Sequence, residues 1–356
     1  MCDTIDATYW ETLKERKIAM GKIRILAALL ALFTLTGCAA RQPAPDYAPT
    51  QQERLTIYTS HKEEVYLPIV MEFEQRTGIW VEVITGGTNE LLEKIEAEQE
   101  NVVADVMFGG GVESLESYRH CFTPYVCTQS DRILPQLLPA DGFWTPFSAL
   151  PVVLIYNTKL VSPQDLTDWD SLEDPAFAGR IAFADPAVSG SSFTALVTRL
   201  FAAGEDREGA MLRLAENLRG IQQSGSGDVL TAVADGSCLV GVTLEESALK
   251  RIAEGADIAM VYPMSGTSCV PDASALVKGA PHSENAKKFL DFTASLDVQQ
   301  LLSDRFCRRS VRIDVPEART LTPLSQIPLV DYDIGWASEN RAAVLSDWSF
   351  FGKEGT

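Results

Sequence analysis

The stretch LTIYTSHKEEVYLPIVMEFEQRTGIWVEVIT, residues 55–85, contains two strand patterns separated by a helix pattern. Residues 55–59 form a short run rich in β-branched side chains, and residues 79–85 form a second one. Gly78 marks the end of the helix, whose apolar side chains recur at helical spacing: Tyr66, Ile69, Val70 and Phe73. A strand, a helix and a second strand in this order predict parallel pairing of the two strands.

The same alternation continues after this unit. GGTNELLEKIEAEQ (86–99) predicts a helix that follows a Gly-Gly turn, and VVADVMF (102–108) predicts a buried third strand that ends in three glycines. In such sheets ligands bind beyond the carboxyl ends of the strands. These ends are residues 59–62, 85–90 and 108–111. Glycine there either lets a ligand approach the backbone or serves only to make a tight turn.

A second unit begins near residue 150, where LPVVLIYNTKL predicts an apolar strand. Strand and helix patterns then alternate through GRIAFADP, a helix from Ser192 and SCLVGVTLEE, and again through PDASALVKGA and ENAKKFLDFTAS. The chain is therefore expected to leave a first lobe near residue 149 and to return near residue 268, and two crossings make a hinge. The predicted division is lobe one at 54–149 plus 268–312, lobe two at 150–267, and a C-terminal segment, 313–356, that packs on the lobes.

The stretch SGSSFTALVTRLF (189–201) predicts a helix with a buried face and a small-residue N-terminus. Its first residues are Ser189, Gly190, Ser191 and Ser192. Free backbone N–H groups, hydroxyls and the positive end of the helix dipole converge there, which suits a phosphate, phosphonate or carboxylate. An ordinary serine N-cap explains the same residues. Both interpretations stay open at this point.

The N-terminal region has the layout of a secretory signal. In MGKIRILAALLALFTLTGC (20–38), two basic residues precede an apolar run that is too short to span a bilayer permanently. LTGC (35–38) resembles a bacterial lipobox, so we expect residues 1–37 to be removed and Cys38 to be lipidated. Met20 is the expected true start, because residues 1–19 carry acids that such leaders lack. A Pro- and Ala-rich tether, 38–53, would follow, on an exported protein at the cell surface or in the periplasm.

Composition and motifs exclude several function classes. The chain has 30 basic and 49 acidic residues, a net charge of −19, so no nucleic-acid partner is expected. The sequence has three histidines and lacks a G-x-S-x-G elbow or a Walker loop, so we predict no enzymatic activity. No metal or cofactor is expected, because no zinc-type spacing occurs. Cys121 and Cys127 flank a short loop and are either a local disulfide or two thiols.

Several of these motifs, in the same order, occur in a known family. LTIYTSHKEEVYLPIVMEFEQRTGIWVEV, ADVMFGGGVESL, PAVSGSSF and ENAKKFLDFTAS resemble solute-binding proteins of ABC importers, of the ferric-ion-binding type. The resemblance implies an α/β, two-lobed periplasmic-binding-protein fold (type II). In that fold each lobe is a mostly parallel sheet flanked by helices, and two hinge crossings join the lobes. It also implies a monomer with an ABC permease as partner, and an anion held by the SGSSF turn.

The resemblance also bears on the ligand. Iron-binding members use a histidine, a glutamate and a tyrosine pair; His61 matches, but the other positions fall on Gly110, Glu245 and Glu246, so a metal site is predicted to be lost. YPMSGTSCVPDASALVKGA and RRSVRIDVPEARTLTPLSQIPLVDYD look closer to the branch that binds hexose phosphates or 2-aminoethylphosphonate. The predicted ligand-binding residues are Ser60, His61, Thr88, Gly110, Ser189, Gly190, Ser191, Ser226, Glu245, Glu246 and Ser268.

Several roles stay open. Glu245 and Glu246 are expected to accept hydrogen bonds from hydroxyls or to pair with an ammonium, with only one needing to point inward. Asp272 either lines the cleft or stabilises the hinge. Arg308 and Arg309 either pair with the anion or form surface ion pairs, and we expect surface ion pairs. The alternative functions are a ferric-ion or anion-chelate binding protein of an iron importer and a ligand sensor for a membrane kinase.

Overall fold

The computed structural model describes residues 49–354. The predicted leader, the lipidation site Cys38 and most of the tether lie outside these residues. Within residues 49–354, nine strands form one curled sheet with the main order β2-β1-β3-β9-β5-β7-β6. No helix of this described part is long and apolar enough to cross a membrane.

Lobe one contains the unit predicted from residues 55–85. Strand β1 pairs in parallel with both β2 and β3, and β3 pairs antiparallel with β9. Helix α2 ends at Gly78, which adopts the left-handed conformation that favours glycine (φ 70°). The elements of this lobe are β1 (Arg54–Thr59), α2 (Glu63–Thr77), β2 (Trp80–Thr85), α3 (Thr88–Ala97), β3 (Val106–Gly111), α4 (Val112–Ser117), β4 (Phe122–Thr123), β9 (Cys269–Val277), α9 (Ser283–Thr293) and α10 (Leu296–Phe306).

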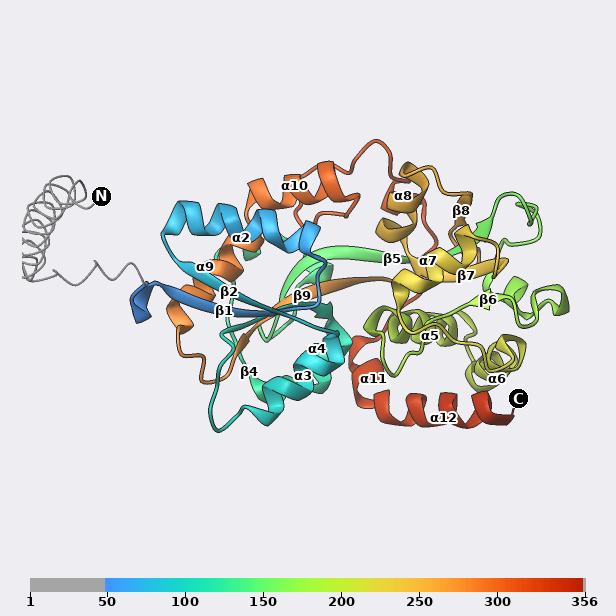
Figure 1. The fold of residues 1–356 in the computed structure, drawn as a ribbon, viewed down its shortest axis with the longest axis horizontal. Helices are drawn as coiled ribbons and strands as arrows, with labels where there is room; N and C mark the ends of the chain where they lie inside the picture. The colour runs from blue at the N-terminus through green and yellow to red at the C-terminus, as the bar shows by residue number, and fades with distance from the viewer. Residues whose placement is uncertain (1–48, 355–356) are drawn as a thin grey trace, which may run out of the picture. The chain divides into compact units, whose positions relative to one another are not determined.

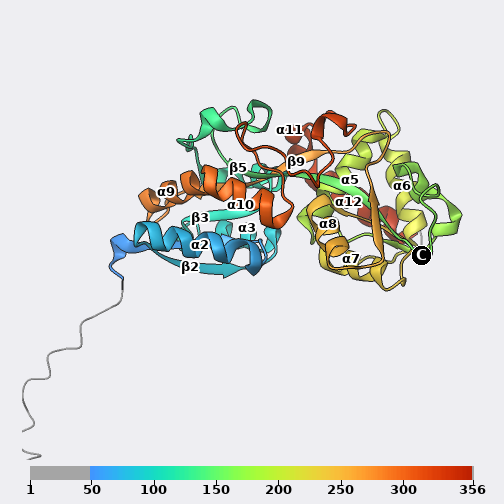
Figure 2. The same ribbon diagram turned by 90° about the horizontal axis from the view of Figure 1, so that it is seen from above.

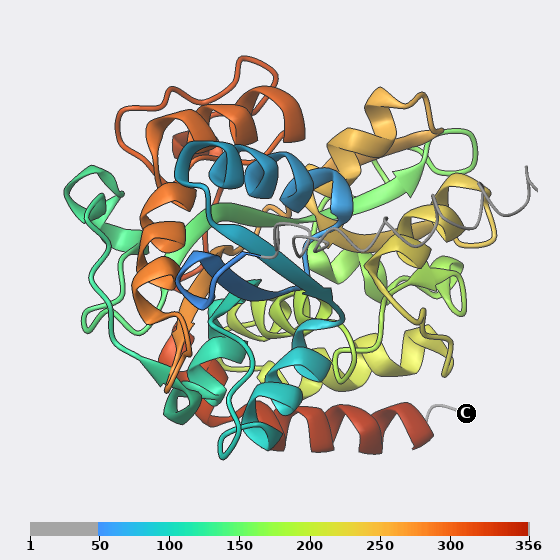
Figure 3. The ribbon, with the colours of Figure 1, turned by 60° about the vertical axis from the view of Figure 1, so that its left-hand side comes forward.

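Helices cover both faces of the lobe-one sheet. Ile69 of α2 and Phe289 of α9 pack in one core cluster with Phe108, whereas Leu91 of α3 packs on the other face with Tyr58. Successive strand residues point to opposite faces, so neighbouring residues of β1 and β3 contribute to different clusters. Figure 3 shows α2 and α3 on opposite sides of β1 and β2.

Lobe two has the same layered arrangement. β6 and β7 pair in parallel, and β5 pairs antiparallel with β7 and β8. Val152 and Leu154 of β5 pack toward α5 and α6, and Val153 packs toward α7 and α8. The elements are β6 (Ile181–Ala182), α5 (Gly190–Ala202), α6 (Arg207–Leu218), α7 (Ser226–Ala234), β7 (Val240–Leu244), α8 (Glu245–Ala253) and β8 (Ile258–Val261).

Two strands join the lobes. β5 (Thr145–Asn157) is buried along its whole length; its first half pairs with β9 and its second half with β7 and β8. Figures 1 and 2 show β5 and β9 between the two halves. The predicted boundary at 149/150 therefore falls inside one strand, and the predicted return near 268 lies next to the start of β9. Parallel pairing holds for β1 with β2 and β3 and for β6 with β7, whereas every pair that includes β5 or β9 is antiparallel, so the pairing in lobe two is not mostly parallel as expected.

The C-terminal segment contacts both lobes. Helix α11 (Ile334–Glu339) lies against α4 of lobe one, and α12 (Arg341–Glu354) lies against α6 of lobe two. Trp348 of α12 is buried in the lobe-two core, 5.5 Å from the ring of Phe183. The segment therefore links the lobes on the side of the sheet that carries α5 and α6 (Figure 1).

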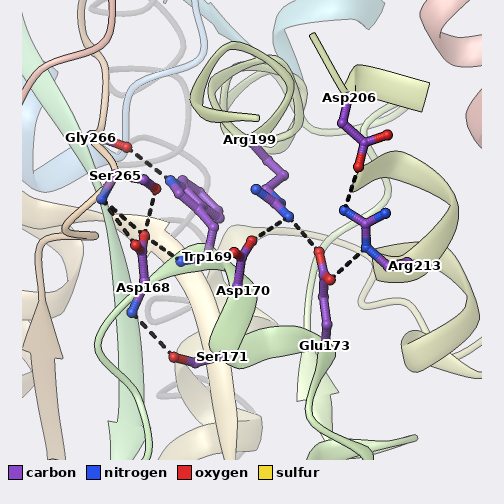
Figure 4. A network of polar contacts seen from close by, with 10 residues as sticks. All are labelled: Asp168, Trp169, Asp170, Ser171, Glu173, Arg199, Asp206, Arg213, Ser265 and Gly266. Carbon is purple, nitrogen blue, oxygen red and sulfur yellow. Dashed lines mark hydrogen bonds and ion pairs between the residues drawn. The ribbon is translucent and has the colours of Figure 1, made fainter. Parts of the chain in front are cut away.

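A network of ion pairs fastens the irregular segment before β6 to the helices of lobe two (Figure 4). Arg199 of α5 is 3% exposed and donates to Asp170 at 2.7 Å and to Glu173. Glu173 also accepts from Arg213 of α6 at 2.6 Å. In the same segment the indole of Trp169 donates to the carbonyl of Gly266 at 2.9 Å. The network therefore holds this segment against both helices and the loop that leads to β9.

Replacing Arg199 tests the contribution of this network to stability. Arg199→Met is expected to lower the free energy of unfolding by about 2 kcal/mol, because the largely buried Glu173 loses a charged hydrogen-bond donor. Arg213→Met is the matched control: Arg213 is 42% exposed, and its loss is expected to cost no more than about 1 kcal/mol. Urea unfolding measures both. Equal losses in the two variants would contradict a special role for the buried guanidinium.

Candidate functional site

A cavity of about 320 Å³ lies between the lobes, beyond the carboxyl ends of β1, β2 and β3. Both lobes and the crossing strands contribute to its wall. Its lining residues include Ser60, His61, Lys62, Glu64, Thr88, Gly110, Gly111, Ser189, Gly190, Ser191, Thr194, Ser224, Gly225, Ser226, Glu246, Ser247, Asp272 and Arg308. Nine of the eleven residues predicted from the sequence are among them, so the fold brings together segments that lie far apart in the chain.

In the described chain, six helices begin at this cavity. Its lining contains the N-cap or a first-turn residue of each: Lys62 for α2, Thr88 for α3, Gly111 for the short α4, Gly190 for α5, Ser226 for α7 and Glu246 for α8. The first N–H groups of a helix have no partner within it, and the helix dipole places partial positive charge at that end. The cavity therefore favours negative charge on a ligand.

The SGSS turn serves as a helix cap and also contributes to the wall. Ser189 is the N-cap of α5, and its Oγ accepts from the backbone N–H of Ser192 at 3.3 Å and lies 3.1 Å from the Oγ of Ser191. The capping interpretation thus describes the Ser189 side chain, while Gly190 and Ser191 still line the cavity. A Cβ on Gly190 would lie 3.7 Å from Thr88 of α3, so the two lobes meet closely here.

The glycine run at the end of β3 leaves space for two side chains of the cavity wall. Gly109 and Gly110 have φ values of +92° and +122°, which side-chain-bearing residues rarely adopt. A Cβ on Gly109 would lie 2.5 Å from Nε2 of His61, and one on Gly110 would lie 2.8 Å from Cγ2 of Thr88. The glycines therefore make room for the residues that follow β1 and β2.

His61 is a buried, neutral imidazole at the cavity wall. Its ring packs edge-on against Phe108, with centroids 4.7 Å apart, and the whole residue is 8% exposed. Burial, with the nearby Arg308 guanidinium, holds the pKa of His61 well below its usual range. Within residues 49–354 its Nε2 has no hydrogen-bond partner and lies 3.6 Å from Oδ2 of Asp272. This nitrogen is itself buried, between the Gly109 backbone and Asp272.

Arg308 lines the same wall, although the sequence analysis expected a surface ion pair. It is 7% exposed, and its Nη1 donates to Oδ2 of Asp272 at 2.9 Å and to Oγ of Ser148 at 3.0 Å. Its Nη2 lies 3.5 Å from Oε1 of Glu246. The Arg308 guanidinium thus lies between two carboxylates, that of Asp272 on the crossing strand β9 and that of Glu246 in lobe two.

Two predicted site residues do not line the cavity. Glu245 is 1% exposed, and both of its oxygens accept from Arg309, each at 2.8 Å. Ser268 is fully buried, with its Oγ 2.6 Å from Oγ1 of Thr198. Glu245 and Glu246 are the first residues of α8, where consecutive side chains point in different directions, and only Glu246 faces the cavity. Arg309, like Arg308, is buried and not at the surface.

Several lining residues were missed by the sequence analysis. Lys62 and Glu64 follow β1 directly and were open to prediction from the rule that ligands bind at strand ends. Thr194, Ser224 and Ser247 carry no distinguishing pattern in the sequence. Asp272, for which the sequence left a cleft or a hinge position open, lines the cavity, and its carboxylate is paired with Arg308 within an otherwise apolar strand.

Other reactive groups lie away from the cavity. Within the described part of the chain, the cysteines are free thiols, and Cys121 and Cys127 are both buried in different core clusters, so they form no disulfide. A group with metal-ligand spacing, Glu96, His120 and Cys121, is also found there. None of its residues lines the cavity.

Comparisons with known proteins agree with this arrangement. Iron uptake protein A1 of Synechocystis is 28% identical over 302 residues, which cover 79% of this chain and 82% of the relative. A Salmonella typhimurium protein, named as a 2-aminoethylphosphonate-binding periplasmic protein, is 24% identical over 68% of this chain and 73% of its own.

A solved structure is similar over most of the described residues. The periplasmic binding protein AfuA of Actinobacillus pleuropneumoniae, with exogenous fructose-6-phosphate bound, superposes with a TM-score of 0.78 and 25% identity. The superposition covers 84% of this chain and 98% of that protein. The model of the family described as bacterial extracellular solute-binding protein matches residues 55–306. This chain therefore belongs to the family of bacterial extracellular solute-binding proteins.

Proposed function

We propose that this chain captures a small organic phosphate or phosphonate in the interlobe cavity and delivers it to the membrane subunits of an ABC importer. One observation carries the choice of an anion: six helix N-termini meet at the cavity of a chain whose net charge is −19. Overall charge repels anions, so a binding site for one has to supply local positive potential. Helix N-termini supply it without a dedicated lysine.

The phosphoryl end is assigned to the α5 and α7 side of the cavity. There the N–H groups of Gly190 and Ser191 and the start of α7 at Ser226 offer donors, and Thr88 adds a hydroxyl from lobe one. Charge-assisted hydrogen bonds of this type are stronger than neutral ones. Because donors come from both lobes, the full set exists only when the lobes are closed.

The organic end is assigned to His61, Glu246 and Asp272. Carboxylate oxygens accept hydrogen bonds from sugar hydroxyls or from an ammonium group, and the neutral imidazole offers a further hydrogen-bonding atom. Arg308 neutralises part of the carboxylate charge. The cavity volume of about 320 Å³ suits a small solute such as a hexose phosphate or an aminoalkylphosphonate.

Ferric iron is the second candidate, favoured by the iron-uptake relative. His61, Asp272 and Glu246 would be its available ligands, but Arg308 donates to Asp272 at 2.9 Å and so places a cation beside the carboxylates that a metal would need. Gly110 offers no side-chain ligand. We therefore rank iron below an organic anion.

A thermal-shift screen tests the proposed ligand class. We expect fructose-6-phosphate or 2-aminoethylphosphonate to raise the melting temperature, because a ligand at about 100 times its Kd adds about 2.7 kcal/mol to the native state. Ferric citrate should leave it unchanged, and the organic phosphate should be recovered intact, since no turnover is proposed. A shift with ferric citrate alone would replace this proposal with iron binding.

Substitution of Gly190 tests where the anion sits. Gly190→Asp is expected to weaken binding at least about 100-fold, because it places a carboxylate at the donors of α5, and like charges at close range cost several kcal/mol. Gly190→Ala is the control: its Cβ would meet only ordinary contacts at 3.7–3.9 Å, so binding should stay within a few fold. Isothermal titration with the stabilising ligand measures both. Tight binding by the aspartate variant would exclude α5 as the anion site.

A further inference from the structure

Glu113 is a buried carboxyl at the contact between the lobes. It lies in the first turn of α4 and is fully buried, and its Oε1 accepts from the hydroxyl of Thr194 on α5 of lobe two. The hydroxyl of Tyr332, from the segment before α11, lies 3.4 Å from the same oxygen. Thr194 itself lines the ligand cavity, and so does Gly111, two residues before Glu113.

The other oxygen of Glu113 is unsatisfied. Within residues 49–354, Oε2 has no hydrogen-bond partner, and it would lie 3.0 Å from a Cβ on Gly111. A buried carboxylate with one unbonded oxygen is costly, whereas the protonated acid carries no charge to desolvate. The geometry by itself therefore favours the neutral form.

Arg341, at the start of α12, is the cation whose charge acts on Glu113. Its Nη2 donates to Asn89 at 3.1 Å, and its guanidinium lies over the ring of Phe193 at 4.2 Å. Within residues 49–354 its Nη1 and Oε2 of Glu113 both lack a hydrogen-bond partner, so these two atoms are not bonded to each other. The other partners of Glu113, Thr194 and Tyr332, contribute hydroxyls. Burial outweighs the hydroxyls and the charge of Arg341 and raises the pKa of Glu113.

The environment of Glu113 depends on contact between the lobes. Thr194 belongs to lobe two, and other contacts also join the lobes: Asn89 of α3 donates to the carbonyl of Ala187 at 2.9 Å, and Lys250 of α8 pairs with Glu64 of α2. If α5 moves away, the carboxyl loses its hydroxyl partner and gains water. Its ionised form is then no longer disfavoured by burial.

We propose that closure of the lobes around the ligand takes up one proton on Glu113, so that the protein binds its ligand more tightly at acid than at alkaline pH. This inference rests on the proposed function only in assuming that ligand binding closes the lobes. It gives the interlobe contact a regulatory role that is separate from the recognition of the anion.

The direction of the effect follows from linkage. In the closed form Glu113 keeps its proton up to a higher pH than in the open form. At any pH between the pKa of Glu113 in the open form and its pKa in the closed form, closing therefore takes up a proton. The Kd then rises with pH, by at most about tenfold per pH unit, and it levels off once the closed form also loses its proton.

Titration of wild type and Glu113→Gln with fructose-6-phosphate between about pH 5 and about pH 8 tests this link. The variant keeps the shape of the side chain and is always neutral, so its Kd should lack the component of pH dependence that Glu113 adds in the wild type. Titration in buffers of different ionisation enthalpy should show proton uptake that is lower in the variant. The ligand's own phosphate ionisation is common to both proteins and cancels in the difference. Identical pH profiles would overturn the proposal.

A second variant keeps the test independent of Glu113→Gln. Tyr332→Phe removes a hydroxyl that favours ionised Glu113, so the fall in affinity should move to higher pH; an unmoved profile would contradict the proposal. Glu116→Gln, on the same helix but bonded to Trp144 and Arg119, is the control and should match wild type.

Small-angle scattering without ligand should show the compact fraction of wild type, but not of Glu113→Gln, decreasing as pH rises. A compact fraction with the same pH dependence in both proteins would count against proton-linked closure. Failure of fructose-6-phosphate to bind wild type at any pH would instead count against the proposed function, while the scattering result would still decide the proton link.

Discussion

Strand β5 is the constraint on which the rest of the structure depends. It is buried along its whole length and pairs with β9 in one lobe and with β7 and β8 in the other. A central strand cannot leave either sheet without breaking ladder hydrogen bonds and exposing apolar side chains. The lobes are therefore tied at this point, and the cavity forms beside it, where the ends of strands from both lobes meet. Any closing motion has to be taken up by small changes along β5 and β9.

The cavity supplies local positive potential within a strongly acidic chain. Its wall is built from helix N-termini, and the charged side chains of its lining are Lys62 and Arg308 together with Glu64, Glu246 and Asp272. Glu246 and Asp272 are held on one side of this wall by the same arginine. The result is a site with two unlike ends, which suits a solute that carries an anion and a neutral or cationic remainder. Glu113, close behind the wall, carries a charge state that depends on closure.

Local patterns were sufficient for much of the fold and part of the site. The strand and helix units of residues 55–111 were predicted from alternating periodicity and from glycine stops, because these features are encoded within short windows. The position of Thr88 followed from the rule that ligands bind at the carboxyl ends of strands, whereas Gly190 and Ser226 were predicted from the starts of helix patterns. By contrast, β5 was predicted to begin at Leu150, because the polar and proline residues before it interrupt the apolar run although they are buried in the sheet.

The sequence by itself determined which segments are strands and helices, that two lobes exist, and that small residues follow the strand ends. Only the tertiary structure decided which polar side chains face the ligand. Glu245 and Glu246 are chemically identical neighbours, but one is buried against Arg309 and the other lines the cavity. Arg308 and Asp272 meet only because a return strand and a distant loop come together. The periodicity of apolar residues within a short segment predicts whether that segment is a strand or a helix. The partners of a polar side chain come from remote segments and are set by tertiary packing, so they cannot be predicted from a short stretch of sequence.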